Sequence, residues 1–427
     1  MITESIYNQY IELLKNELVP ALGCTEPIAI AYASAKARNV LGAFPEEIIV
    51  ECSGNIIKNV KGVIVPTTHD MRGVEASAII GAIGGNAEKS LEVLSEVTEQ
   101  DVIKAKELVK TDLCKVVLKK GVSNLYIKVI MKNKGDVASV LIIDTHTNIF
   151  EISKNGETLF KGQYEQKTDK MFNKEIFNVD LIYEFAETVK IEDVEKLIDR
   201  QIDFNTKIAN EGLKQSYGAN VGKVLLHNSH DIKTLAKAYS AAGSDARMAG
   251  CTLPVIINSG SGNQGMTVSL PVIKYAECLC VPREKLIRAL VLSNLLAIYQ
   301  KSGIGKLSAY CGAVSAACGA GAAITYLYEQ PLNVIKMTIK NVLGNVSGIV
   351  CDGAKSSCAA KIASSVDAAI MAHEMAVDGQ VYSDGEGLNL DDVDLTIENV
   401  SHLAKEGMKE TDLNILEMMI NSRDYEQ

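Results

Sequence analysis

One stretch of the chain, residues 307–361, constrains the fold most, because small residues and cysteines are interleaved throughout it. It opens with LSAYCGAVSAACGAG and closes with GIVCDGAKSSCAAK. Glycine allows a backbone to approach another backbone or a bulky group closely. Thiols stand within these small-residue segments at Cys311, Cys351 and Cys358. We therefore interpret the stretch as tightly packed helices that cradle a sulfur-ligated iron–sulfur cluster.

The three thiols are dispersed, and the chain contains no Cys-x-x-Cys pair. A [4Fe–4S] cluster held by three thiolates keeps one iron open as a Lewis acid for a thiol, hydroxyl or carboxylate. This favours a non-redox lyase over an electron carrier, although a three-cysteine zinc site stays open as an alternative. We interpret the other candidate cysteines, apart from Cys24, as plain core residues: Cys52, Cys114, Cys251, Cys278, Cys280 and Cys318.

A second cysteine motif, Gly-Cys24-Thr-Glu-Pro, predicts the start of a helix that runs to residue 40. A thiol placed before a helix N-terminus has its pKa lowered by the helix dipole. We therefore expect Cys24 to be a catalytic thiolate. The alternative is a buried small residue at a tight turn.

The pattern of apolar residues predicts an α+β protein. Short β-rich runs between residues 47 and 152 indicate a small antiparallel sheet, and the pattern beyond residue 179 is mostly helical. We predict an N-terminal α+β domain, residues 1–178, that carries Cys24, and an all-α domain of packed Ala/Gly-rich helices, residues 179–427. The polar segment 156–178 would form the boundary, and the site would lie between the domains.

A Gly/Ser/Asn-rich loop at residues 258–265 leads into a predicted helix and offers N–H groups and hydroxyls to an anion. Its GxGxxG spacing lacks a βαβ context, so we reject a dinucleotide site. Arg247 has the fork geometry for a substrate carboxylate, unless Asp245 pairs with it. The loop side chains predicted to bind substrate are Ser259, Ser261 and Asn263.

A polar cluster in the N-terminal half is a further candidate for binding the substrate carboxylate. It follows a predicted strand and is flanked by glycine. The predicted substrate-binding residues are Ser53, Asn55 and Lys58. A solvated turn is an equal alternative.

The composition limits the partners. A net charge of −10 argues against nucleic acid or an anionic membrane as the main partner. The first 18 residues are amphipathic and charged, unlike a signal peptide, so we expect a cytoplasmic protein. The apolar run at 309–326 is Ala/Gly-rich and is better read as a buried helix than as a membrane span. We expect a small-molecule substrate, and a homodimer is compatible with the sequence.

Together these motifs resemble the L-cysteine desulfidase family, which is related to the α-domain of iron–sulfur L-serine dehydratases. The resemblance covers nearly the whole chain. It implies an oxygen-sensitive [4Fe–4S] enzyme that converts L-cysteine to sulfide, ammonia and pyruvate without pyridoxal phosphate. Cys24, Cys311 and Cys351 match the family cysteines most tied to function, and Cys358 matches a further one. The resemblance does not settle which three thiols bind iron.

Three alternatives to this activity remain. The first is an L-serine dehydratase of the same cluster type. The second is a non-catalytic iron- or thiol-sensing protein, and the third is a metal-free scaffold in which Gly, Ala and Cys only pack.

Overall fold

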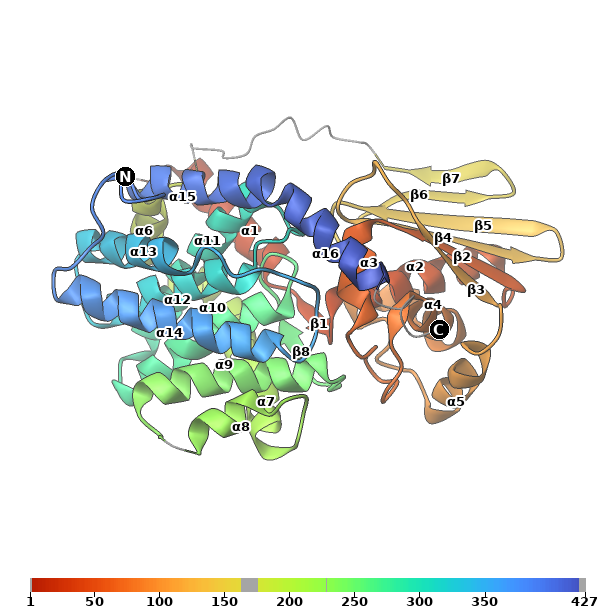
Figure 1. Cartoon of the computed structure of the whole chain (residues 1–427), viewed down its shortest axis with the longest axis horizontal. Helices are drawn as coiled ribbons and strands as arrows, with labels where there is room; N and C mark the ends of the chain where they lie inside the picture. Colours follow the sequence, from red (N-terminus) through yellow and green to blue (C-terminus); the bar gives the residue numbers. More distant parts are fainter. Residues whose placement is uncertain (1, 163–175, 228, 422–427) are drawn as a thin grey trace.

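The computed structural model describes residues 2–162, 176–227 and 229–421, and shows a helical half beside a half that contains a six-stranded sheet (Figure 1). The protein is therefore an α+β protein, as predicted. Among the described residues, no helix has both the length and the hydropathy that a membrane crossing requires.

The sheet has the strand order β3-β2-β4-β5-β6-β7. Buried and half-buried residues alternate along β2, so its buried residues Ile48, Val50 and Cys52 lie on one face. The strands are β2 (Glu47–Cys52), β3 (Cys114–Leu118), β4 (Tyr126–Asn133), β5 (Asp136–Ile143), β6 (Ile149–Lys154) and β7 (Glu157–Lys161). The predicted antiparallel pattern holds for β2 and β4 to β7, but β2 and β3 are parallel. The intervening helices form the crossover that a parallel pair requires.

Helices of the sheet half pack against the sheet. Helix α2 contacts β4 and β5 and packs on α4. The helices are α2 (Thr25–Leu41), α3 (Gly54–Lys61), α4 (Gly73–Gly84), η1 (Ala87–Glu92) and α5 (Glu99–Leu108).

The helical half is held together by close approaches between small residues. A Cβ on Gly319 of α12 would lie 2.4 Å from the carbonyl oxygen of Ser293 on α11, so only glycine allows these helices to pack at this separation. The elements after residue 176 are α6 (Val179–Thr188), α7 (Ile191–Lys214), α8 (Val221–Leu226), α9 (Ile232–Met248), β8 (Pro254–Ile256), α10 (Gly262–Cys278), α11 (Arg283–Ile304), α12 (Gly312–Leu327), α13 (Leu332–Val346), α14 (Cys358–Val377), α15 (Val393–His402), η2 (Leu403–Gly407) and α16 (Lys409–Asn421).

The two ends of the chain cross between the halves. Helix α1 (Glu4–Glu17) packs against α7 and α11, and strand β1 (Pro20–Leu22) pairs with β8. At the other end, α16 reaches back and contacts α3 (Figure 1). The domain bounds 1–178 and 179–427 stay a prediction, and residues 163–175 of the predicted boundary lie outside the described residues.

Candidate active site

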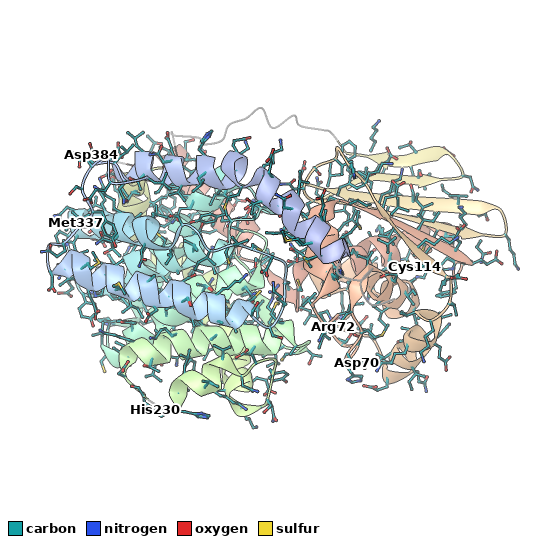
Figure 2. All side chains as sticks on the ribbon, viewed as in Figure 1. Asp70, Arg72, Cys114, His230, Met337 and Asp384 are labelled. Carbon is teal, nitrogen blue, oxygen red and sulfur yellow. The ribbon has the colours of Figure 1, made fainter. Side chains whose placement is uncertain are left out.

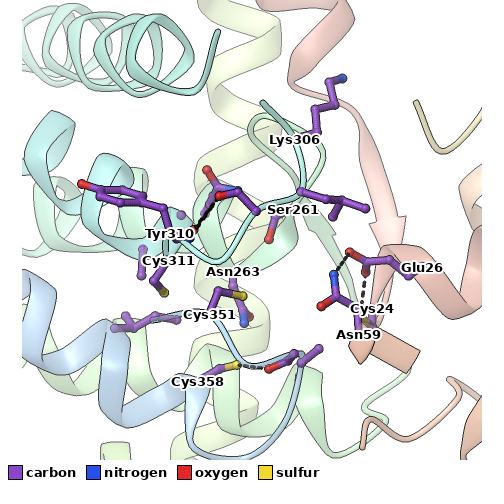
Figure 3. A pocket seen from close by; sticks show the side chains of 18 of the residues that line it. Cys24, Glu26, Asn59, Ser261, Asn263, Lys306, Tyr310, Cys311, Cys351 and Cys358 are labelled. Atoms are coloured by element: carbon purple, nitrogen blue, oxygen red, sulfur yellow. Dashed lines mark hydrogen bonds between the residues drawn. The ribbon is translucent and has the colours of Figure 1, made fainter. Parts of the chain in front are cut away.

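A small pocket of about 100 Å³ lies between the two halves and contains the cysteines of the sequence motifs (Figure 3). In the sheet half, the lining residues belong to α2 and α3. In the helical half, they belong to α9 to α12 and α14 and to the loops that precede these helices. The polar residues that line it are Cys24, Glu26, Asn59, Arg247, Ser261, Asn263, Gln264, Lys301, Lys306, Ser308, Tyr310, Cys311, Cys351 and Cys358. The volume suits a compact substrate rather than a drug-sized ligand.

Backbone pairing brings Cys311 and Cys351 together although they are distant in sequence. The amide of Cys311 donates to the carbonyl of Ile349 at 3.0 Å, and the amide of Cys351 donates to the carbonyl of Ala309 at 2.6 Å. Cys358 begins α14, and its thiol lies 3.8 Å from the carbonyl oxygen of Gly353 in the same loop. The three thiols therefore lie at one side of the pocket (Figure 3).

Four helices begin at this pocket. Cys24 is the N-cap of α2, Ser261 is the N-cap of α10, Cys311 is the N-cap of α12, and Cys358 is the first residue of α14. A helix N-terminus carries a partial positive charge and unpaired N–H groups. The convergence of four such ends favours an anionic occupant.

Two buried cations strengthen that preference. Arg247 is 2% exposed, and its Nε has no hydrogen-bond partner among the described residues. The predicted alternative, an Asp245–Arg247 pair, is not formed: Asp245 accepts from the amide of Gly222 at 3.0 Å instead. Burial lowers the pKa of Lys301 to about 8, against the opposing influence of Cys351 and Cys311.

Across the pocket, Glu26 stands at the centre of a hydrogen-bonded group. The Cys24 thiol donates to Glu26 Oε2 at 3.0 Å, the Thr25 hydroxyl donates to the same oxygen at 3.2 Å, and Asn59 Nδ2 donates to Oε1 at 3.0 Å. His146 Nε2 lies 3.8 Å from Oε1. Burial works against ionisation of Glu26, but the His146 ring and the Cys24 thiol outweigh it and hold the pKa of the carboxyl below its usual range.

The predicted helix start at Cys24 is confirmed, but the predicted lowering of its pKa is wrong. Burial and the neighbouring Glu26 raise the pKa of the Cys24 thiol well above its usual value, with Arg247 as a weaker opposing influence. Burial and the charge of Cys351 likewise raise the pKa of Cys311 to about 12, and burial raises that of Cys358. Loss of hydration is thus the largest cause of the raised pKa of each of these three thiols.

Cys311, Cys351 and Cys358 line one side of the pocket, a set of thiol donors of the kind that holds an iron–sulfur cluster. Among the described residues, no three His, Cys, Asp or Glu side chains converge as a site for one metal ion. In a cluster, different irons bind the different thiolates, so the sulfurs need not converge on one point. The anion-favouring helix ends and Lys301 suit the net negative charge of such a thiolate-ligated group.

The structure gathers some predicted substrate residues and separates others. Ser261, Asn263 and Arg247 line the thiol pocket. Ser259 is buried, and its hydroxyl donates to Asn258 Oδ1 at 2.8 Å. The Ser259 side chain therefore bonds within its own loop and does not line the pocket. The predicted residues Ser53, Asn55 and Lys58 line a different cavity beside α16.

Several site residues carried no clear sequence signal. Gln264 lies in the glycine-rich loop and fits because Gly312 has no Cβ: one placed there would lie 2.5 Å from the Gln264 side chain. Lys301 and His146 look like ordinary residues of a helix and a turn. Glu26 stood within the quoted motif, and its buried side chain gives it a role beyond starting a helix.

The remaining cysteines correct one further expectation. Cys52, Cys251 and Cys318 are buried, as predicted for core residues, but Cys278 and Cys280 are exposed. Cys278 is the last residue of α10, and Cys280 lies two residues beyond it, where the chain leaves the core. Cys114 is half-buried and lies on β3 in the sheet half (Figure 2).

Fold and site together define an α+β protein with a thiol-lined, anion-favouring pocket between its halves. The family model described as serine dehydratase alpha chain matches residues 88–417, and the chain belongs to that family. A protein of Lachnoclostridium phytofermentans is 56% identical over 97% of this chain and 100% of its own length, and one of Treponema denticola is 48% identical over 98% and 99%. Both carry the name UPF0597 protein, which states no activity.

Proposed function

We propose that this protein is a carbon–sulfur lyase, an L-cysteine desulfidase, that converts L-cysteine to sulfide, ammonia and pyruvate by β-elimination. One observation carries the proposal: a single small pocket contains three clustered thiols together with a buried cation and a buried carboxylate, Arg247 and Glu26. These two charges complement the carboxylate and the ammonium of an α-amino acid. Membership of the serine dehydratase alpha chain family supports lyase chemistry.

Cys311, Cys351 and Cys358 would hold a [4Fe–4S] cluster. When bound, such a cluster supplies a Lewis-acidic iron for the β-substituent of the substrate. The role of Lys301 is to offset the negative charge of the thiolates, since it is buried at the same pocket and the charges of Cys351 and Cys311 raise its pKa against the effect of burial.

The other side of the pocket binds and orients the amino acid. Arg247 pairs with the substrate carboxylate, since its Nε is unpartnered among the described residues. Glu26 accepts from the substrate ammonium, because its three donors leave lone-pair capacity on the carboxylate. Ser261 and Asn263 complete the carboxylate site.

Cys24 removes the proton from Cα. The pKa of its thiol is raised, and the thiol releases its proton to solvent when the substrate binds, because the substrate ammonium held beside it by Glu26 favours the thiolate. The electron pair of the Cα–H bond forms the Cα=Cβ double bond, and the sulfur leaves Cβ with its bonding pair. The released 2-aminoacrylate is hydrolysed to pyruvate and ammonia.

The second candidate is an L-serine dehydratase of the same cluster type, favoured by the description of the matching family model. It requires the same ammonium and carboxylate contacts and differs in the leaving group.

The test is anaerobic purification with iron and sulfide counts and an absorption spectrum, followed by turnover with L-cysteine and L-serine. We expect a bound cluster and equal amounts of sulfide and pyruvate from L-cysteine. Faster release of pyruvate from L-serine would establish the dehydratase instead. A cluster-loaded protein inert toward both amino acids would refute both enzymes and leave the sensing protein.

A further inference from the structure

A second, larger cavity of about 520 Å³ is lined by residues of α3 and the C-terminal helix α16. These two helices contact each other (Figure 1). Its walls are the first turn of α3, the loop 119–124 and one face of α16. Leu416 of α16 sits over Gly54, where a Cβ would lie 2.2 Å from its Cδ2. The volume is in the usual range for small-molecule sites.

The cavity has a positive end. The first turn of α3 presents N–H groups without intrahelical acceptors and the positive end of the helix dipole. Lys120 is exposed and forms no ion pair with the described residues, and Lys119 lies 3.6 Å from Glu51. These groups are suited to a carboxylate.

The remaining walls define the rest of the ligand. Asn55 lines the cavity, and its Oδ1 accepts no hydrogen bond from the described residues, which leaves this acceptor for a donor of the ligand. The exposed Glu417 at the rim adds a negative charge. The apolar residues of the wall are Leu118, Val122, Leu413 and Leu416. An aliphatic carboxylic acid with an N–H or O–H donor near its carboxylate matches the positive end, the Asn55 acceptor and the apolar wall.

Two hydrogen bonds connect this cavity to the thiol pocket. Lys58 Nζ, which pairs with Asp412 of α16, donates to the carbonyl of Cys351 at 3.3 Å. Asn124 Nδ2 donates to the carbonyl of Leu307 at 3.0 Å. Both acceptors belong to residues that line the thiol pocket. Any coupling between two binding sites acts equally in both directions.

We propose that the α3–α16 cavity binds a small aliphatic amino or hydroxy acid, and that its occupancy is transmitted to the thiol pocket through Lys58 and Asn124. The proposal does not rest on the reaction of the thiol pocket. The two hydrogen bonds identify the loops that would respond.

Binding can be measured by fluorescence because the chain contains no Trp. Leu413→Trp places one fluorophore at the cavity wall, at a position that is 56% exposed. The probes are L-leucine, its 2-hydroxy analogue and its 2-oxo analogue, which has no donor. We expect saturable changes with the first two and at least tenfold weaker binding of the oxo acid. Ile103→Trp on α5, 59% exposed, is the matched control and should not respond.

Second substitutions in the Leu413→Trp protein test the contacts of Lys120 and Glu417 with the ligand one at a time. Lys120→Glu should weaken all three probes at least tenfold. Glu417→Gln should weaken L-leucine but not the hydroxy acid, whereas equal effects on both probes would overturn Glu417 as the partner of the ammonium. Inorganic phosphate binding as tightly as L-leucine would overturn the organic ligand, and an unchanged affinity in the Lys120→Glu variant would overturn the anion site.

Hydrogen exchange of the unsubstituted protein tests the coupling and does not depend on a Trp variant. L-leucine should slow amide exchange in residues 307–311 and 349–353. Asn124→Ala removes the bond to Leu307, so it should lose the protection at 307–311 and keep that at 349–353, which depends on Lys58. Absence of protection in the unsubstituted protein together with no fluorescence response would overturn the whole proposal, and binding without protection would overturn the coupling.

Discussion

Replacement of Glu26 by Gln isolates the charge that we assign to ammonium recognition. Glu26 is 8% exposed, lines the thiol pocket and accepts hydrogen bonds from Cys24, Thr25 and Asn59. Glutamine has nearly the same shape and retains one carbonyl oxygen as an acceptor. The variant therefore preserves most of the packing and removes the negative charge.

The expected loss follows from the strength of a charge-assisted hydrogen bond. A bond to a charged group contributes about 1.5–3 kcal/mol. At about 1.4 kcal/mol per factor of ten, Glu26→Gln should weaken an ammonium-bearing ligand by about 10- to 150-fold. A ligand without an ammonium should lose little.

Calorimetric binding of three unreactive or truncated ligands measures this difference without turnover. L-alanine carries both charged groups, 3-mercaptopropionate lacks the ammonium, and cysteamine lacks the carboxylate. Glu26→Gln should weaken L-alanine and cysteamine but not 3-mercaptopropionate, and the matched variant Arg247→Gln should weaken L-alanine and 3-mercaptopropionate but not cysteamine. If Glu26→Gln weakens the binding of all three ligands equally, Glu26 maintains the structure of the pocket and does not bind the ammonium.

Three further predictions concern the cysteines and a buried histidine. Cys24→Ala should retain iron and lose about 10²–10⁴-fold in turnover, as for loss of a general base; loss of iron would make Cys24 a ligand. Iron retention against a chelator should be weaker at pH 6.5 than at pH 8.5, because burial raises the pKa of Cys311 and Cys358 and metal must displace their protons; equal retention would contradict this. Burial lowers the pKa of His373 from 6.5 to about 4, so below pH 6.5 the unfolded chain binds more protons than the folded one. The free energy of unfolding should therefore fall by about 3 kcal/mol between pH 6.5 and 4, and denaturant titrations of His373→Gln should show a correspondingly smaller fall.

The sequence predicted features that depend on local signals and missed those that depend on long-range packing. The helix start at Cys24 follows from residues that adjoin it, and the close helix contacts follow from residues such as Gly319. The placement of Lys58 does not, because it depends on α16, which returns from the far end of the chain. Lys301 could not be recognised because its burial follows from the packing of α11 against the loops of the thiol pocket.

The same distinction explains the wrong expectation for the pKa of Cys24. A helix terminus contributes about 0.3–1 kcal/mol to a nearby charge, and up to about 2 kcal/mol when partly buried. The change in the pKa of Cys311 from 9.0 to about 12 corresponds to about 4 kcal/mol against ionisation. Helix ends alone therefore cannot ionise the thiols of this pocket, whereas coordination to a metal deprotonates a thiol outright. The positive helix ends then act on the ligated group and on the substrate carboxylate, whose charges persist at neutral pH.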